Sequence, residues 1–352
     1  MSTSSTITAA ARVQHETEDI KMLLWNSAGV EDLLGNSSNN GMWNVEQVLV
    51  PIFDVLILIL GIGGHTMVMV ILCRRSRRRM GQSGTGTDVL LLALSFADLL
   101  LLSTLPFHTS AIAMQHWPFG DAMCRLAGFL GSACTSASAF TLSTLAVSRY
   151  MTVVHPARTF RFLSPRQVAI TTALLWVPAC CLATPQLVFR FVGNSPNNPD
   201  GLACFAFLSH RDQLIYGLIH FLVAFLLPLI TIAIAYGNIY LFLWRTRNAV
   251  QAPQVERYQS KVTQTSVILV VVFTLCWLPS YGLTLALLYD KSSGATGTSP
   301  RYGPFSVFAR LMAIASTVLN PILYVLISQR FRQDVLRLFK REGQKASGGR
   351  AA

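Results

Sequence analysis

The chain has 352 residues, of which 52% are hydrophobic and only 12% are charged, whereas soluble domains carry about 25% charged residues. This composition excludes an ordinary soluble domain and points to a membrane protein. The formal net charge of +12 would also suit a nucleic-acid partner. No nucleic-acid-binding motif is present, however, and the basic residues alternate with long apolar blocks, so we expect no nucleic-acid binding.

The polar segment 1–44 lacks the basic start and apolar core of a cleavable signal peptide. It contains a glycosylation sequon at Asn36-Ser37-Ser38, which is usable only on the lumenal side of a membrane. We therefore expect an extracellular N-terminal tail, carried outward by the first membrane helix.

Seven apolar runs follow, each with the roughly 20 residues that a membrane-crossing helix needs. The predicted helices are Val45–Cys73, Thr87–Gln115, Asp121–Val154, Pro165–Leu187, Arg211–Trp244, Glu256–Tyr289 and Pro304–Ile327. Most of the 28 lysines and arginines lie after helices one, three, five and seven. By the positive-inside rule these segments are cytoplasmic and the N-terminus is outside.

A shorter segment, Ser328–Arg341, places apolar side chains such as Phe331 and Val335 on one face and basic residues elsewhere, as is typical of a helix on the membrane surface. The predicted fold is an all-α membrane protein, a seven-transmembrane helix bundle plus this short amphipathic cytoplasmic helix. The bundle with its surface helix spans 45–341, between the tail 1–44 and a cytoplasmic tail 342–352.

The second helix contains an acid, Asp98, flanked by apolar residues on both sides. A carboxylate inside a membrane needs polar partners, a cation or a proton. Candidates at similar depth in other helices are His65, Ser138, Ser316, Thr317 and Asn320. Oxygen donors around one carboxylate could hold a hydrated sodium ion, and a purely structural hydrogen-bond network is the alternative.

The third, sixth and seventh helices carry motifs that together suggest one mechanism. The third ends in Ser148-Arg149-Tyr150, the sixth contains Cys276-Trp277-Leu278-Pro279, and the seventh contains Asn320-Pro321-Ile322-Leu323-Tyr324. An arginine at the end of a membrane span usually marks function, and prolines such as Pro279 and Pro321 can form hinges. Shaping of the bundle is the alternative role for each proline. We interpret Arg149 as a conformational switch.

Only two of the seven cysteines, Cys124 and Cys204, lie near a helix end or in a loop. They are the one plausible disulfide pair if that side of the membrane is oxidising.

These motifs, in this order, resemble those of rhodopsin-like G-protein-coupled receptors over about residues 45 to 341. The residues that carry the resemblance are Leu94–Leu99 with Asp98, Trp117-Pro118-Phe119-Gly120 before Cys124, Ser148-Arg149-Tyr150, Trp176, Pro228 with Tyr236, Cys276-Trp277-Leu278-Pro279 and Asn320-Pro321-Ile322-Leu323-Tyr324. Within the family, Thr141–Val147, the short third cytoplasmic loop and Ile327–Arg332 are most similar to peptide receptors of the galanin and allatostatin type. Somatostatin, opioid and orphan receptors are the alternatives.

The resemblance implies a plasma-membrane receptor rather than an enzyme, with a disulfide between Cys124 and Cys204. It also implies that Arg149 pairs inside the resting bundle and is freed when the sixth helix swings outward. Tyr236 and Tyr324 would then turn toward it and open a cleft for a heterotrimeric G protein. Ligand binding acts by shifting the population toward this open state.

Two residues depart from the family pattern. Ser148 stands where an acid usually pairs with the arginine, so we expect a weaker resting clamp and higher basal signalling. His65 stands where an asparagine usually bonds to the acid of the second helix. Protonated His65 would pair with Asp98 and compete with sodium, whereas a neutral, hydrogen-bonded histidine is the alternative.

The segment Gly128–Ser132, where an amine receptor would carry an acid, contains none, which argues against an amine ligand. The seventh helix contains no lysine for a Schiff base with retinal, which excludes an opsin. Arg310 lies in an otherwise apolar stretch and should face a cavity and meet an acceptor on the ligand. Tyr281 and His220 are favoured beside it. Further candidates are His108, Gln115, Ser132, Thr135, Trp277, Thr284 and Tyr289.

The expected ligand is an extracellular neuropeptide with aromatic side chains, and a lipid with an acidic head is the alternative. A scavenger or orphan receptor without G-protein coupling stays open because of Ser148, and a transporter or channel is disfavoured because no internal repeat is visible. The segment after Arg341 has Ser347 as its only hydroxyl, so arrestin binding should be weak or use other loops.

Overall fold

The computed structural model describes residues 45–78, 86–156, 165–195, 198–205, 210–247, 253–289, 303–327 and 331–338. In this part of the chain, 7 helical spans are long and apolar enough to cross a membrane. They are formed by α2 (Val45–Arg78), α3 (Gly86–Met114), α4 (Gly120–Val154), α6 (Pro165–Phe189), the continuous α7–η2–α8 (His210–His220, Phe221–Leu226 and Leu227–Arg247), α9 (Pro253–Tyr289) and α10 (Gly303–Ile327).

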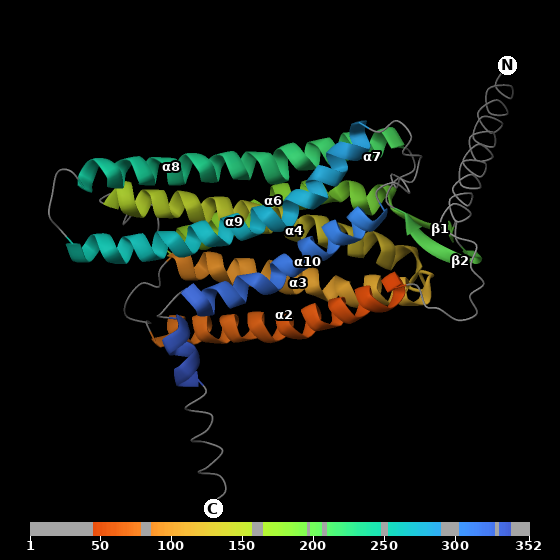
Figure 1. Ribbon diagram of the computed structural model, residues 1–352, viewed down its shortest axis with the longest axis horizontal. Helices are drawn as coiled ribbons and strands as arrows, with labels where there is room; N and C mark the ends of the chain where they lie inside the picture. The colour runs from red at the N-terminus through yellow and green to blue at the C-terminus, as the bar shows by residue number, and fades with distance from the viewer. Residues whose placement is uncertain are drawn as a thin grey trace, which may run out of the picture.

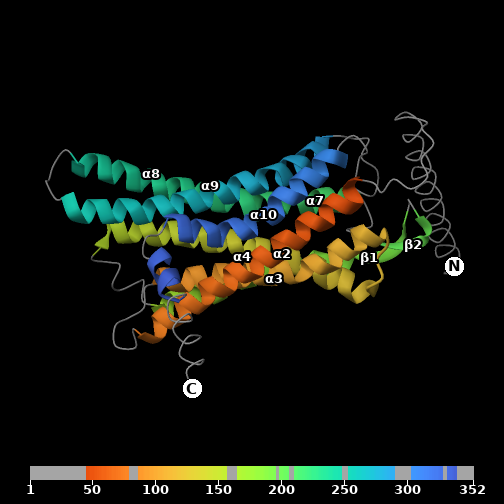
Figure 2. The ribbon, with the colours of Figure 1, turned by 60° about the horizontal axis from the view of Figure 1, so that its bottom comes forward.

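The spans lie side by side along the long axis of the molecule (Figures 1 and 2), which confirms the predicted seven-helix bundle. The predicted ends of the helices agree with those in the structure to within several residues. The largest difference is at the end of α2, which continues through the basic residues to Arg78. Lysine and arginine are good helix formers, so the helix does not stop where the apolar run ends.

Helix α4 is the central element of the bundle. In its most apolar stretch of 18 residues, 67% of the residues are buried, against 17–44% in the corresponding stretches of the other spans. Its middle is built from small residues, Ala133 to Ala139, all of them buried. Small side chains let neighbouring helices approach closely. The hydroxyls of Thr135, Ser136 and Thr141 each donate to the carbonyl four residues earlier. These buried hydroxyl groups therefore all have a hydrogen-bond acceptor.

The fifth span contains a turn of π-helix just before a proline. The backbone N–H of Leu227 donates to the carbonyl of Leu222, five residues earlier. The next residue, Pro228, has no N–H, and a proline ring crowds the preceding helical turn. The wider turn therefore stands where α-helical hydrogen bonding is interrupted, and such turns are frequent at functional sites.

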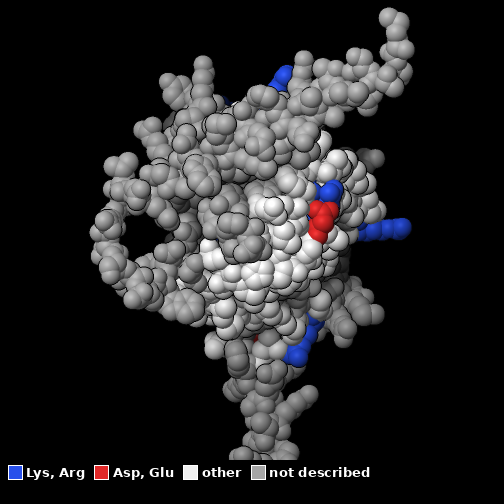
Figure 3. Space-filling model, turned by 90° about the vertical axis from the view of Figure 1, so that its right-hand side faces the viewer, with Lys and Arg blue, Asp and Glu red and all other residues white. Residues whose placement is uncertain are grey.

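A β-hairpin, which the apolar pattern of the sequence does not predict, lies at one end of the bundle (Figure 1). Strand β1 (Phe191–Ser195) pairs antiparallel with β2 (Asn198–Phe205), with Val192 opposite Cys204. We call this end the hairpin end. Figure 3 faces it and shows a mostly uncharged described surface, on which an acidic group lies against a basic one and a few other basic side chains stand apart.

The opposite end, which we call the Arg149 end, carries a short helix at 331–338. Phe331 is buried there and its ring lies 6.1 Å from that of Tyr324. Val335 and Leu338 pack against the same core, so the predicted apolar face is the one that docks on the bundle. Residues 328–330 and 339–341 of the predicted surface helix lie outside the described residues.

Candidate functional site

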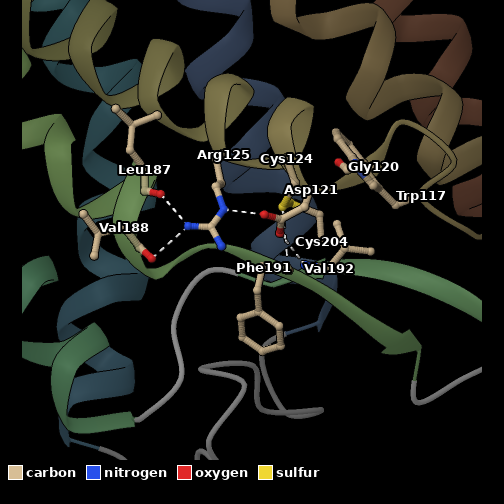
Figure 4. Close-up of polar contacts among 10 residues, drawn as sticks. All are labelled: Trp117, Gly120, Asp121, Cys124, Arg125, Leu187, Val188, Phe191, Val192 and Cys204. Atoms are coloured by element: carbon tan, nitrogen blue, oxygen red, sulfur yellow. Dashed lines mark hydrogen bonds and ion pairs between the residues drawn. A yellow bond between two sulfur atoms is a disulfide. The ribbon is translucent and has the colours of Figure 1, made fainter.

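The hairpin is held onto the first turn of α4 (Figure 4). Cys124 and Cys204 form the predicted disulfide, with their Cα atoms 5.7 Å apart. The backbone N–H of Val192 donates to Asp121 Oδ1 at 3.2 Å. Arg125 pairs with Asp121 at 2.5 Å and also donates to the carbonyls of Leu187 and Val188 at the end of α6.

The loop between α3 and α4 completes this attachment. The backbone N–H of Trp117 donates to the carbonyl of Leu202 in β2 at 2.6 Å, and its indole N–H donates to the carbonyl of Gly120 at 2.9 Å. Gly120 has a φ of 73°, a conformation that costs glycine little. The Trp117–Gly120 motif thus positions β2 over the helix ends.

Two cavities lie between the hairpin and the helices. The first, of about 280 Å³, is lined by residues of α3 and β2 together with Arg310. The second, of about 320 Å³, reaches deeper, between α4 and the residues Tyr216, His220 and Trp277. His108 and Arg190 line both cavities, so the two adjoin at these side chains.

Arg190, which is not among the predicted pocket residues, directly follows α6. Its Nε donates to Oε1 of Gln186 at 2.7 Å, and its Nη1 lies 3.3 Å from Sγ of Cys204. Burial lowers the pKa of the Arg190 guanidinium from its ordinary value, yet an arginine stays protonated at neutral pH. A cation is therefore present between the two cavities.

The second cavity is floored by a network of hydrogen bonds around His220. Its Nδ1 is 3.1 Å from the hydroxyl of Tyr281, and its Nε2 is 3.2 Å from the hydroxyl of Ser136. Above it, Ser132 and Tyr216 are joined through their hydroxyls at 2.7 Å. The structure therefore brings the two predicted pocket residues His220 and Tyr281 together beside the second cavity.

Arg310 lines the first cavity but has a carboxylate partner inside the protein. Its Nη2 lies 2.7 Å from Oδ2 of Asp54 in α2, whose side chain is fully buried. The hydroxyl of Thr109 donates to the same carboxylate oxygen at 2.8 Å. The charge of Arg310 is thus paired with Asp54, an acid inside the bundle that the apolar pattern does not single out, while the Arg310 side chain borders the first cavity.

The remaining predicted pocket residues divide into two groups. Gln115 lines the first cavity, and Thr135 and Trp277 line the second. Thr284 borders neither cavity and donates to the carbonyl of Ser280 at 3.0 Å. Tyr289 ends α9, and its side chain lies outside the described residues, as does the sequon at Asn36.

The polar network around Asp98 forms in the middle of the bundle. Asn320 donates to Oδ2 at 2.7 Å and Ser138 to Oδ1 at 3.5 Å. His65 Nε2 is 3.5 Å from Oδ2 and 2.7 Å from the carbonyl oxygen of Thr317. Since a carbonyl only accepts, this ring nitrogen carries the proton. The hydroxyls of the remaining candidates, Ser316 and Thr317, donate within their own helix, to the carbonyls of Ala313 at 2.6 Å and Ile314 at 2.8 Å.

Trp277, which lines the second cavity, lies beside two aromatic rings of its own helix at tilted angles. Its ring centroid is 6.4 Å from that of Tyr281 and 6.0 Å from that of Phe273. Within the described part of the chain, its buried indole N–H has no hydrogen-bond partner. Pro279 follows inside the same helix.

At the Arg149 end, Ser148 is buried and Arg149 is half-buried on the last turns of α4. Tyr150 lies 3.3 Å from Nε2 of His155 through its hydroxyl. Tyr324 is buried in the same apolar cluster against which Tyr150 and Tyr236 pack. These predicted switch residues therefore gather at one end of the bundle, whereas Asn320 lies in the Asp98 network in the middle and the cavities lie at the other end.

Comparison with known proteins identifies this arrangement. The family described as "7 transmembrane receptor (rhodopsin family)" matches residues 64–324. The chain is 29% identical to the galanin receptor type 2 of Mus musculus over 329 residues, covering 92% of this chain and 85% of that receptor. It is 30% identical to the somatostatin receptor type 5 of Rattus norvegicus over 324 residues, covering 88% and 84%.

These relatives are receptors and not enzymes, and they confirm the resemblance to the galanin-type branch, with somatostatin receptors matching at nearly the same identity. Together with the seven spans and the family match, they show that the chain belongs to the rhodopsin family of seven-transmembrane receptors.

Proposed function

We propose that the protein is a plasma-membrane receptor that binds an extracellular peptide at its hairpin end and activates a heterotrimeric G protein at its Arg149 end. The observation that carries the proposal is the similarity to receptors named for galanin and somatostatin over most of the chain. The two cavities, which contain a cation and aromatic side chains, suit a peptide with acidic and aromatic groups. In this proposal 45–341 is the receptor domain, 1–44 is extracellular and 342–352 is cytoplasmic.

Helix α9 provides the connection between the two ends. It carries Tyr281 and Trp277 beside the second cavity, and Pro279 lies between them. A ligand that displaces Tyr281 from His220 would act on this helix directly above the proline. If the ligand binds more tightly to the state in which α9 has swung outward at the Arg149 end, it increases the population of that state, since only a difference in affinity between two states shifts their populations.

Nucleotide exchange on a purified G protein tests the coupling. The full chain in lipid nanodiscs should accelerate exchange over G protein alone, and a member of a library of extracellular peptides should accelerate it further. The same protein with Arg149→Ala is the matched control and should be inactive. Exchange that never exceeds the rate of G protein alone would sink the proposal.

Ser148 favours a second candidate, a receptor that binds its ligand without coupling, because this residue replaces the acid of the family pattern. The same assay separates the candidates when binding is measured in parallel. Saturable peptide binding without any exchange would favour the non-coupling receptor. Labelling of an N-terminal epitope on intact cells checks the proposed orientation.

We also infer that sodium has a weak effect on this receptor. Asp98 accepts hydrogen bonds from the amide of Asn320 and the hydroxyl of Ser138, and beside it lies the ring of His65, whose Nε2–H donates to Thr317. A hard cation would instead need several carboxylate, carbonyl or water oxygens. These residues therefore fit a hydrogen-bonded carboxylate better than a sodium ion. Sodium chloride should change basal exchange little compared with an equal concentration of potassium chloride, and more after His65→Asn.

A further inference from the structure

Two arginines line the cavities, and within the described part of the chain Arg190 is the one without a carboxylate beside it. Arg310 is paired with Asp54, and Arg125 with Asp121. No carboxylate of the described residues lies within 4.0 Å of the Arg190 guanidinium, and the lining of neither cavity contains Asp or Glu. A cation in such surroundings is costly unless an anion or water meets it.

The surroundings of Arg190 fix the position of its side chain. The buried Gln186 accepts a hydrogen bond from Nε at 2.7 Å, and Nη1 lies 3.3 Å from Sγ of Cys204. Nη2 has no hydrogen-bond partner among the described residues. On the opposite side, the side chain occupies the space beside Gly128 of α4, where an added Cβ would overlap its Cδ and Nε. A glycine at this position thus makes room for the arginine between the helices.

Below the arginine, the second cavity is lined by aromatic side chains, among them Tyr216, His220 and Trp277. An arginine fork binds a carboxylate through two parallel hydrogen bonds. The second cavity below it would take a flat apolar group of the same ligand that carries the carboxylate.

We propose that Arg190 binds a carboxylate of the ligand, and that the second cavity takes an aromatic side chain next to that carboxylate. The ligand class is then a peptide with an acidic side chain or free C-terminus beside an aromatic residue. This inference rests on the proposed function for its choice of a peptide. It moves anion recognition from Arg310, where the sequence placed it, to Arg190.

Matched fragment probes test the proposal on the purified full chain. N-acetylphenylalanine carries the carboxylate and the ring, and N-acetylphenylalaninamide differs from it only in lacking the charge. We expect the acid to bind at least about tenfold more tightly than the amide, as for a charge-assisted pair of hydrogen bonds. Saturation-transfer NMR in detergent micelles gives both affinities.

Three variants locate the effect. Arg190→Gln should abolish the preference for the acid while leaving the affinity for the amide unchanged, which also shows that the site is still folded. Gly128→Ala keeps the charge but displaces the arginine and should reduce the preference. Arg211→Gln removes an exposed charge at the start of α7 that lines neither cavity and should keep the preference.

The proposal is overturned if the wild-type protein does not prefer the acid, including the case in which neither probe binds, or if the preference survives Arg190→Gln. Tighter, Arg190-dependent binding of decanoate than of N-acetylphenylalanine would overturn the peptide assignment in favour of a lipid acid. Because no probe is read out through nucleotide exchange, failure of this site and failure of G-protein coupling are separate results.

Discussion

Ser148 stands at a position where the resemblance to the receptor family predicts an acid. It is buried on α4 directly before Arg149, and its backbone carbonyl accepts a hydrogen bond from Thr152 at 2.7 Å. A hydroxyl cannot supply the charge that an acid at this position would place beside an arginine. The resting state is therefore expected to be held less firmly than in relatives with an acid.

Restoring the acid provides the corresponding prediction. Ser148→Asp should lower basal nucleotide exchange by about tenfold, since a hydrogen bond to a charged group contributes about 1.5–3 kcal/mol. Ser148→Asn has nearly the same size without the charge and should lower it much less. Unchanged basal exchange in the aspartate variant would contradict the idea that the missing acid weakens the resting state.

Polar residues inside the spans could be recognised from the sequence, but their partners could not. Asp98 stood out as a carboxylate between apolar neighbours, and the structure places Asn320, Ser138 and His65 around it. Asp54 satisfies the same criterion and was missed. Which acid meets which base depends on the rotation of each helix about its axis, and the apolar pattern of a span fixes that rotation poorly because lipid-facing and buried positions are both apolar.

At the scale of elements, the Asp54–Arg310 pair joins α2 to α10 at the hairpin end. Asp54→Ala would leave Arg310 without its carboxylate, which for a buried pair costs about 3–5 kcal/mol. Because 28% of the Arg310 side chain is exposed, we expect the lower end of that range. The melting temperature of the purified receptor should fall accordingly.

The double variant Asp54→Leu with Arg310→Leu is the control for this experiment. It removes both charges together, and such a replacement is often neutral. It should recover most of the melting temperature lost in Asp54→Ala. If the single and double variants melt alike, the pair does not stabilise the contact between α2 and α10.

A second polar contact joins elements at the Arg149 end. Arg75 of α2 donates to Asp88 of α3 at 3.2 Å and to Asp334 of the helix at 331–338 at 2.6 Å. Its guanidinium therefore connects the surface helix to two spans, in addition to the packing of Phe331 on Tyr324.

Arg75→Ala should loosen the helix at 331–338 without unfolding the bundle. We expect faster backbone hydrogen exchange across that helix, measured by mass spectrometry in nanodiscs. Arg74→Ala is the matched control, because Arg74 is exposed on the same turn and should leave the exchange unchanged. Equal protection in both variants would show that apolar packing alone holds the helix.

The spans were predictable and the hairpin was not, for a physical reason. In a bilayer every backbone group must be satisfied within the segment, so a run of about 20 apolar residues is enough to predict a helix. The register of β1 and β2 depends instead on distant contacts, such as the disulfide between Cys124 and Cys204 and the bond from Trp117 to Leu202. The space that Gly128 leaves for Arg190 is likewise visible only after the helices are packed.

For the whole molecule, the hairpin end is covalently closed across a sequence separation of 80 residues. Removing the bond with Cys124→Ser and Cys204→Ser should reduce stability by about 4 kcal/mol in the chain-entropy account of a loop of this length. We expect a lower melting temperature and faster hydrogen exchange in β1 and β2. The variant Cys134→Ser, which changes a free cysteine, controls for the substitution itself, and a hairpin that stays equally protected without the disulfide would contradict the prediction.

The π-helical turn between His220 and Pro228 bears on how this span tolerates insertions and deletions. Such a turn contains one residue more than the α-helical turn that would connect the same two helical segments. Deleting one residue within Phe221–Leu226 should therefore restore ordinary winding and leave His220 facing Tyr281. The same deletion within α8 would rotate everything before it by about 100° relative to the rest of the helix, and the floor of the second cavity would lose its histidine.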